Sequence, residues 1–412
     1  MLGLLLSRIV RKGTLTIVYS NGRREVLGAG EPRATIRLHD ARVPFDILRN
    51  PELAFGEAYM EGRLTADGGD LYVALDILMS NMEETRTPAF LRLLRALRVV
   101  TKALRQRNAV RRARQNVAHH YDLSGRLYDL FLDSDKQYSC AYFSHAGESL
   151  EDAQIAKKRH VAAKLHLDRP GLSVLDIGSG WGGLALDLAR DLGATVTGVT
   201  LSEEQITVAN ARAAKAGLAS RVKFALTDYR ALTGAFDRIV SVGMFEHVGV
   251  PNYQAFFDKS AALLKDDGAM LLHFIGRLDG PGASNPWIMK YIFPGGYTPA
   301  LSEVLPAIER SGLFVTDIET LRLHYAETLK AWRARFRDRW AEAAAIYDER
   351  FCRMWDFYLT AMEVAFRRQH LCVYQIQLAR RIDALPVTRD YMLDDERTMH
   401  FAGREHMPHA AE

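Results

Sequence analysis

The sequence predicts a doubly wound α/β domain preceded by a small α+β domain. From about residue 118 onward, short apolar stretches with strand spacing alternate with amphipathic stretches that have helical spacing. The first of these strands runs into a glycine-rich turn, VLDIGSGWGGLAL at residues 174–186. Earlier in the chain, strand patterns surround an Asn-Gly turn. The 412 residues, 48% hydrophobic and 25% charged, are enough for two globular domains.

Residues 1–84 are expected to form the small α+β domain. The stretch TLTIVYSNGRREVLG alternates apolar and polar residues around Asn21-Gly22, which is a strong hairpin signal. Residues 33–48, RATIRLHDARVPFDIL, have the pattern of a further strand. Two helical patterns follow at residues 51–62 and 69–82.

Residues 85–117 are predicted to be a basic helical linker. Ten lysines and arginines lie between Arg86 and Arg114, and no Asp or Glu occurs from Thr85 to Tyr121. Such a stretch favours an anionic partner, either phospholipid head groups or nucleic acid. A solvated helical face, or a linker that touches other subunits, explains the pattern equally well, so both interpretations stay open.

The α/β domain is expected to span residues 118–390. After Gly276 the alternation breaks, and a segment rich in Gly, Pro and aromatic residues leads to two long helical patterns. A late insertion of this kind is typical of a helical lid over an active site. Residues 391–412 are expected to form a loosely held polar tail. Before the break, strands are predicted at 173–178, 195–201, 221–229 and 269–276, a strand that runs into a loop at 236–249, and helices at 181–193, 202–217 and 253–268.

The three cysteines, Cys140, Cys352 and Cys372, show no CxxC spacing. A disulfide framework or structural zinc site is therefore not expected, no metal is predicted, and a reducing cytoplasm fits best. The chain starts with an apolar run followed by basic residues, the reverse of a secretory signal. No apolar run is long enough to span a bilayer, so a soluble or peripheral protein is expected.

The glycine-rich turn contains Asp176, Gly178, Gly180 and Gly182, which form a D-x-G-x-G-x-G pattern between a strand and a helix. A dinucleotide site uses G-x-G-x-x-G, and here the third glycine falls one position early. An acid two residues before the first glycine suits a ligand with a cationic amino-acid end, such as S-adenosylmethionine. The alternative is a tight strand–helix turn without a ligand.

Several motifs in order resemble those of the cyclopropane-fatty-acyl-phospholipid synthases and the related mycolic acid cyclopropane synthases. They are HHYDLSGRLYDLFLD, YSCAYF, VLDIGSGWGGLA, GVTLSEEQ, MFEHVG, LLHFIG and HYAETLKAW, and the similarity covers about Gln115 to Arg380. The small N-terminal domain resembles that of the phospholipid-acting branch. The resemblance implies a Rossmann-like class I methyltransferase domain with a helical lid.

The same resemblance implies S-adenosylmethionine as cofactor and a cis double bond in an acyl chain of membrane phospholipid as acceptor. It also implies a cytoplasmic homodimer that associates peripherally with the anionic inner face of the membrane, without a nucleic-acid partner. By family analogy the cofactor site is lined by Tyr138, Ser139, Asp176, Gly178, Gly180, Gly182, Thr200, Leu201, Gln205, Asp228 and Tyr229.

The family uses a bound bicarbonate as base, and the resemblance maps its holders onto Cys140, Glu246, His273, Tyr325 and the backbone of Ile275. Imidazole, phenol and thiol groups can donate to carbonate oxygens, and a carboxylate can accept the bicarbonate proton. Each residue also has a structural explanation: Cys140 as a small buried hydrophobe, His273 as a hydrogen-bonded core residue and Glu246 as a helix-start acid.

The sequence departs from many family members at Met362, where a cysteine is common. If the match is right, nucleophilic cysteine catalysis at that position is excluded. Three rival functions remain: a sister reaction that gives methyl, methylene or hydroxy acyl chains from the same carbocation, an RNA or small-molecule methyltransferase, and a lipid carrier on an inactive methyltransferase fold.

Overall fold

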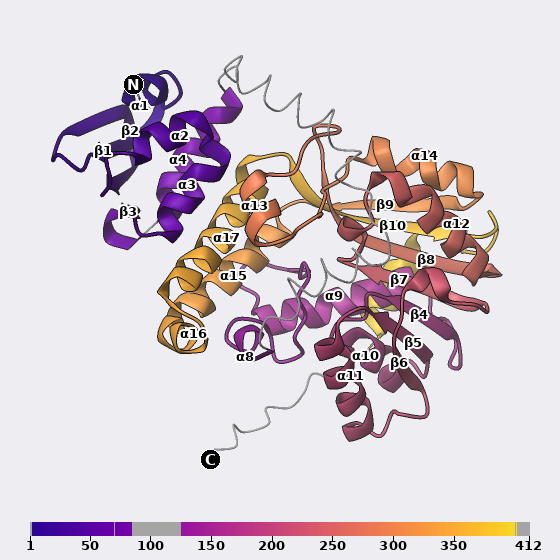
Figure 1. Cartoon of the computed structure of the whole chain (residues 1–412). Helices are drawn as coiled ribbons and strands as arrows, with labels where there is room; N and C mark the ends of the chain where they lie inside the picture. The colour runs from indigo at the N-terminus through magenta and orange to yellow at the C-terminus, as the bar shows by residue number, and fades with distance from the viewer. Residues whose placement is uncertain (1, 70, 85–124, 400, 402–412) are drawn as a thin grey trace.

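The computed structural model describes residues 2–69, 71–84, 125–399 and 401. The basic segment from Arg86 to Arg114 lies outside these residues. Within them, a small α+β domain sits at one end of the molecule and a larger α/β domain at the other (Figure 1). No helix of the described residues is both long and apolar enough to cross a bilayer.

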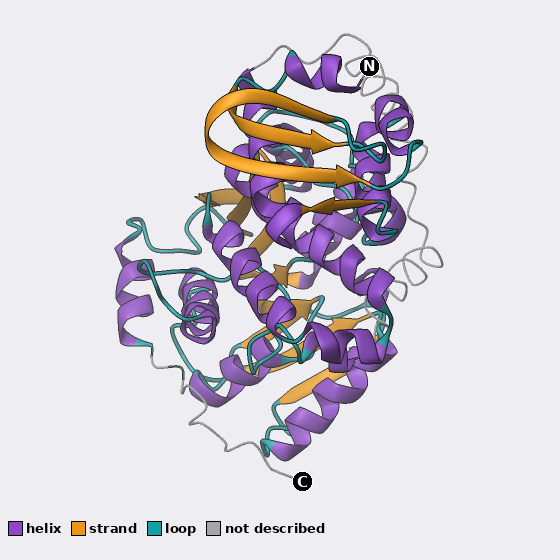
Figure 2. Ribbon diagram, turned by 90° about the vertical axis from the view of Figure 1, so that its left-hand side faces the viewer, coloured by secondary structure: helices purple, strands orange, loops and turns teal. Residues whose placement is uncertain are grey.

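The N-terminal domain contains a three-stranded sheet in the order β1-β2-β3. The predicted hairpin is confirmed: Gly22 has a positive φ of 81°, and Tyr19 and Arg23 close the turn. Strand β2 is long and curved, so that Ile17 of β1 is paired with both Glu25 and Ile36 of β2 (Figure 2). The elements are α1 (Leu2–Ser7), β1 (Lys12–Val18), β2 (Arg24–Leu38), α2 (Val43–Arg49), α3 (Pro51–Met60), β3 (Leu64–Ala66) and α4 (Leu71–Glu84).

One part of this domain differs from the expectation. The strand expected over residues 33–48 ends at Leu38, and residues 43–49 form helix α2. Pro44 lies in the first turn of that helix, where its fixed φ favours helix and its missing N–H costs nothing. Val43, Phe45 and Ile47 alternate as in a strand, but only Val43 and Ile47 are buried and Phe45 is 67% exposed.

The larger domain contains a seven-stranded sheet in the order β6-β5-β4-β7-β8-β10-β9. Strands β4 to β8 are parallel, and β10 lies antiparallel between β8 and β9. The strands are β4 (Ser173–Ile177), β5 (Thr195–Thr200), β6 (Val222–Leu226), β7 (Phe236–Val242), β8 (Leu264–Arg277), β9 (Phe314–Leu321) and β10 (Leu371–Ala379).

Helices cover this sheet on two sides, so the predicted doubly wound α/β class is confirmed. One hydrophobic core packs α9, α10 and α11 on the sheet, and another packs α12 and α14 on it. The helices are α8 (Gly125–Tyr128), α9 (Leu150–Lys164), α10 (Gly183–Asp191), α11 (Glu203–Lys215), α12 (Tyr253–Leu263), α13 (Pro286–Tyr291), α14 (Leu301–Ser311), α15 (His324–Asp338), α16 (Trp340–Ile346), α17 (Glu349–Arg368) and α18 (Asp390–Thr398).

The sequence pattern did not identify β9 and β10, because the alternation was expected to break after Gly276. The residues expected to be a loose tail also contain helix α18, which contacts α9 and buries Met392. His160 of α9 lies within hydrogen-bond distance, 2.9 Å, of Glu396 of α18. The end of the described chain is therefore part of the α/β domain.

The late helices lie between the two domains, with α17 and α15 in the centre of Figure 1. Helix α17 contacts both α3 and α4 of the N-terminal domain. The buried carboxylate of Asp356 binds Arg337 of α15 at 2.6 Å and the Tyr59 hydroxyl at 2.8 Å. The helices expected to form a lid therefore also hold the N-terminal domain against the α/β domain.

Candidate active site

The glycine-rich turn shapes the floor of a pocket at the carboxyl ends of β4, β5, β6 and β7. This is the edge at which doubly wound sheets bind their ligands. Gly178 and Gly182 both have positive φ, 88° and 83°. A Cβ on Gly178 would lie 2.8 Å from Met244, and one on Gly182 would lie 2.5 Å from the ring of Phe224. Side chains at these positions would therefore both strain the backbone and collide with neighbours.

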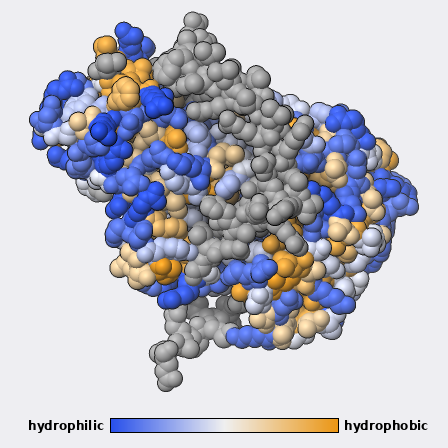
Figure 3. All heavy atoms as spheres, viewed as in Figure 1, coloured by the Kyte–Doolittle hydropathy of each residue, from blue (hydrophilic) through white to orange (hydrophobic). Residues whose placement is uncertain are grey.

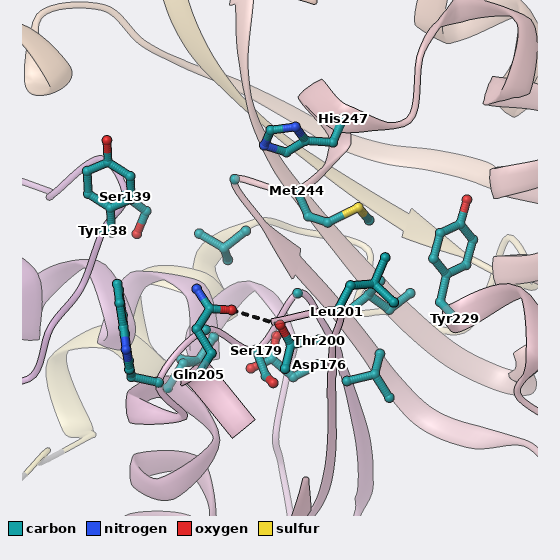
Figure 4. A pocket seen from close by; sticks show the side chains of 18 of the residues that line it. Tyr138, Ser139, Asp176, Ser179, Thr200, Leu201, Gln205, Tyr229, Met244 and His247 are labelled. Carbon is teal, nitrogen blue, oxygen red and sulfur yellow. Dashed lines mark hydrogen bonds between the residues drawn. The ribbon is translucent and has the colours of Figure 1, made fainter. Parts of the chain in front are cut away.

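Ten of the eleven residues predicted to bind the cofactor line this pocket. The exception is Gly182, which is the N-cap of α10 and packs against Phe224. In Figure 4, Tyr138 and Ser139 lie at one end of the pocket and Tyr229 at the other, with Asp176 and Gln205 between them. The lining residues among the predicted set are Tyr138, Ser139, Asp176, Gly178, Gly180, Thr200, Leu201, Gln205, Asp228 and Tyr229.

Asp176 is the main anionic group of the pocket floor. It is the penultimate residue of β4 and is 2% exposed. Burial raises the pKa of its carboxyl to about 7, although the ammonium of Lys157 opposes this rise. A buried carboxylate needs a positive partner. The amino-acid end of S-adenosylmethionine supplies such a cation, so the pocket fits this cofactor.

Hydrogen bonds fix the polar side chains beyond β5 and β6. Thr200 donates through Oγ1 to Gln205 Oε1 at 2.7 Å (Figure 4), and the Ser202 side chain caps the N-terminus of α11. The Asp228 carboxylate receives two bonds from the Arg230 guanidinium, at 2.6 and 2.8 Å. Asp228 therefore lines the pocket as the acidic partner in an ion pair with Arg230.

Glu246 and Ile275 meet directly next to the pocket. Glu246 lies in a 3-10 turn after β7, and its Oε1 accepts a bond of 2.6 Å from the Ile275 backbone N–H of β8. Its Oε2 is buried and has no hydrogen-bond partner among the described residues. Burial raises the pKa of Glu246 to about 7.

His273 lies two residues before Ile275 on β8, so both side chains are on the same face of the sheet. Its Nδ1 lies 3.1 Å from Gln375 Nε2 of β10. Burial, reinforced by the charges of Lys157 and Lys164, lowers the pKa of His273 to about 3. The imidazole is therefore neutral at physiological pH.

Cys140 lies in the segment before α9, and Tyr325 lies on α15. Both are buried in the hydrophobic cluster against which Ile275 packs. The backbone next to Cys140 is tied to α15, because the Ala141 N–H donates to Thr328 Oγ1 at 3.0 Å. The Tyr325 ring packs edge-on against Phe366 and Trp332. Burial raises the pKa of the Cys140 thiol, so it stays a neutral, weak donor.

The remaining cysteines are not nucleophiles at physiological pH. Burial raises the pKa of Cys352 and of Cys372 to about 11 in each case. Met362 lies on α17 and packs against the hydrophobic cluster that contains Cys140 and Tyr325.

Sequence reasoning missed Lys157 and His247, which also line the pocket. The Lys157 ammonium is buried on α9, donates to Gln137 Oε1 and to Ser139 Oγ, and interacts electrostatically with Asp176, Cys140 and His273. Burial lowers the pKa of Lys157 to about 8 and that of His247 to about 4. No helix was predicted over residues 150–164, so Lys157 could not be placed on a buried helix face from the sequence.

Comparisons with known proteins agree with this geometry. A family model described as mycolic acid cyclopropane synthetase matches residues 108–376, and a domain of unknown function matches residues 3–86. The cyclopropane-fatty-acyl-phospholipid synthase of Escherichia coli K12 is 38% identical over 86% of this chain and 90% of its own. Tuberculostearic acid methyltransferase UfaA1 of Mycobacterium tuberculosis is 36% identical over 91% and 90%.

Solved structures give the same result. The cyclopropane synthase MmaA2 of Mycobacterium tuberculosis matches with a TM-score of 0.62 and 34% identity, over 65% of this chain and 98% of its own. The mycolic acid cyclopropane synthase CmaA1, complexed with SAH and CTAB, matches with a TM-score of 0.61 and 34% identity, over 64% and 97%. The chain therefore belongs to the mycolic acid cyclopropane synthetase family and is an S-adenosylmethionine-dependent methyltransferase.

Proposed function

We propose that the protein adds the methyl carbon of S-adenosylmethionine to a cis double bond of an unsaturated phospholipid acyl chain and closes a cyclopropane ring, assisted by bicarbonate. The observation that carries this proposal is the buried Glu246 Oε2, which has no partner among the described residues. The same carboxylate binds the Ile275 N–H, two residues along β8 from His273. A buried carboxylate oxygen without a partner is costly. The hydroxyl of a bicarbonate ion would satisfy it, so the residues fit this anion.

The reaction requires a base that acts after methyl transfer. The alkene π electrons form a bond to the methyl carbon, the sulfur–carbon bond breaks with its electron pair on sulfur, and a cation remains on the other alkene carbon. Loss of one proton from the transferred methyl group then frees an electron pair that closes the ring. When bound, S-adenosylmethionine supplies the carbon and bicarbonate the base.

The protein's own residues prepare this step in three ways. Glu246 accepts the proton of the bound anion, which makes that anion more basic. His273, Tyr325 and Cys140 donate to its oxygens and hold it in place. The aromatic cluster around Tyr325 excludes water, which would otherwise capture the cation as an alcohol.

The relatives favour a second candidate as well. A relative from Pseudomonas putida, at 35% identity, is named as a probable fatty acid methyltransferase, and UfaA1, at 36%, is named as a tuberculostearic acid methyltransferase. A methylene or hydroxylated chain arises if the same cation loses a different proton or meets water, and a methylated chain arises only if a separate reductant donates a hydride to the cation. The experiment must therefore identify the product and not only measure methyl transfer.

The test is incubation of the full chain with ¹³C-methyl S-adenosylmethionine and vesicles of mono-unsaturated phospholipid. We expect the acyl chains to gain one CH₂, to lose alkene signals and to show labelled cyclopropyl signals by NMR. Removal of bicarbonate should slow turnover, and adding it back should restore the rate. A labelled methyl, methylene or hydroxyl product would instead establish the sister reaction, and methyl transfer indifferent to bicarbonate would overturn the base assignment.

We also propose that the protein is a cytoplasmic homodimer that associates with the inner face of the membrane. This part of the proposal rests on the family resemblance. In the N-terminal domain Leu4, Val26 and Phe45 are 65%, 66% and 67% exposed, and α1 contacts both β2 and α2. Figure 3 shows hydrophobic spheres at the end of this domain that carries α1. The lid segment WRARFRDRW is a weaker docking candidate, because Arg333, Arg335, Arg337 and Arg339 all pair with carboxylates of the protein.

Replacing Leu4, Val26 and Phe45 together by serine should weaken vesicle binding by about tenfold or more, because three apolar side chains lose their insertion energy. Co-sedimentation with vesicles of increasing anionic lipid content measures this, and wild-type binding should fall with salt. The matched control is Ile382→Ser with Val387→Ser, two exposed apolar side chains of the α/β domain. Equal loss in both variants, or none in either, would contradict docking through the N-terminal domain.

A further inference from the structure

A ladder of three polar side chains crosses the sheet beside the candidate active site. His273 of β8 is paired with Gln375 of β10, and Gln375 is paired with Glu319 of β9. Directly opposite residues of neighbouring strands project from the same face, so the three side chains lie in a row. Gln375 is fully buried and His273 is 2% exposed. A polar ladder at this depth needs defined hydrogen bonds.

Lys164, at the end of α9, supplies the charge that orients this row. Its ammonium donates to Gln375 Oε1 at 2.8 Å and contacts the Glu319 carboxylate. The carboxylate favours the charged form of Lys164, which burial opposes. Glu319 also binds His160 Nε2 at 2.7 Å, and His160 Nδ1 lies 2.9 Å from Glu396 of α18. The Lys164 ammonium therefore lies between Gln375 and a carboxylate that is itself bound by His160.

The direction of each bond follows from the chemistry of the groups. An ammonium can only donate, so it fixes the oxygen end of the Gln375 amide toward α9. The amide nitrogen is then directed toward His273, where it lies 3.1 Å from Nδ1. An amide NH₂ group also only donates, so Nδ1 must accept. A neutral imidazole carries one N–H, and that proton must then be on Nε2.

We propose that Gln375, oriented by Lys164, is a positioning residue that holds His273 in its Nε2–H tautomer, so that His273 can donate to the anion bound in the active site. This inference rests on the proposed function, in which His273 holds bicarbonate. In the opposite tautomer, Nε2 would present a lone pair to an anion and repel it. Partners that orient metal-binding histidines typically contribute about 10- to 100-fold to activity, and we expect an effect of the same order here.

The first experiment needs no variant. In protein labelled with ¹⁵N at histidine, the ring signals of His273, assigned through the loss of signals in His273→Ala, report which nitrogen carries the proton. We expect a pyridine-type Nδ1 and a pyrrole-type Nε2 across the neutral pH range. A protonated Nδ1, with or without a protonated Nε2, would overturn the inference whatever product the enzyme forms.

The second experiment reverses the hydrogen bond. In Gln375→Glu the side chain keeps its shape and its contact with Lys164, but the atom that faces Nδ1 becomes an acceptor. The His273 proton should therefore move to Nδ1, turnover should fall at least about tenfold, and half-saturation should need more bicarbonate. Affinity for S-adenosylmethionine should stay unchanged, because Gln375 does not line the cofactor pocket.

Gln377→Leu is the matched control for the substitution at Gln375. Gln377 lies on the same strand, is 1% exposed and binds the Lys164 backbone and Tyr391, not His273. It should leave the tautomer and the bicarbonate requirement unchanged even if stability falls. Wild-type turnover in Gln375→Glu, or the same bicarbonate shift in Gln377→Leu, would overturn the inference. An Nε2–H tautomer in a protein that forms no cyclopropane would support the role of Gln375 and contradict the proposed function.

Discussion

Replacing Glu246 by glutamine should lower kcat for cyclopropane formation by about 100- to 10,000-fold, the range typical of a lost acid–base partner. The amide still accepts the Ile275 N–H bond, so the turn after β7 keeps its geometry. It cannot take a proton from a bound anion, and deprotonation of the methyl group should become rate-limiting. Product formation in the vesicle assay measures the change, with S-adenosylmethionine affinity as the internal reference.

The same substitution should stabilise the protein at alkaline pH. Burial raises the pKa of Glu246 from 4.5 to about 7, so ionisation in the folded state is unfavourable, and stability is lost as the pH rises through this range. At about 1.4 kcal/mol for each tenfold change in proton affinity, the cost is roughly 3 kcal/mol. Glu246→Gln should therefore melt at a higher temperature than the wild type at pH 8 and at nearly the same temperature at pH 5.

Glu342→Gln is the control for both measurements, because Glu342 forms an exposed pair with Arg339. It should change neither turnover nor the pH dependence of melting. Full activity in Glu246→Gln would show that this carboxylate takes no part in the chemistry. A stability difference that is the same at pH 5 and pH 8 would show that the carboxylate is not buried as described.

Replacing Asp176 by asparagine should weaken S-adenosylmethionine binding by about 30-fold or more, since removing one member of a buried charge pair costs at least about 2 kcal/mol. Burial raises the pKa of Asp176 to about 7 in the free protein. Wild-type affinity should therefore increase between pH 6 and pH 8 as the carboxylate ionises, and the variant should lose this part of the dependence. Isothermal titration calorimetry across that range measures both effects.

Asp168→Asn is a suitable comparison, because Asp168 lies before β4 and pairs with exposed Arg169. It should bind the cofactor like the wild type at each pH. A loss of less than threefold in the affinity of Asp176→Asn for S-adenosylmethionine would show that Asp176 is not the partner of the cofactor's amino group.

The sequence predicted those parts of the fold that depend on local patterns. Gly22 identified the hairpin, and the Asp176–Gly182 turn identified the switch from strand to helix, because both need backbone conformations that few residues allow. Strand β9 was missed because its residues are mostly partly exposed, as at a sheet edge. Strand β10 was missed because a short buried run after a long helix has no periodicity that distinguishes it from more helix.

The candidate site was predictable only where a residue belongs to a motif. Glu246 and Ile275 are 29 positions apart and their contact depends on the pairing of β7 with β8. Gln375 and Lys164 lie in no recognised motif, and 211 positions separate them. Local spacing carries no information about such contacts, so the residues that orient His273 became visible only in the folded chain.

The position of β10 also determines the order in which the protein can be assembled. Strand β9 is made before β10 but can join the sheet only through it, because β10 lies between β8 and β9. During synthesis, strands β4 to β7 and the cofactor pocket at their ends can therefore form first, while the edge of β8 that carries His273 remains open. A chain still on the ribosome therefore lacks the ladder that orients His273 until β10 has been made.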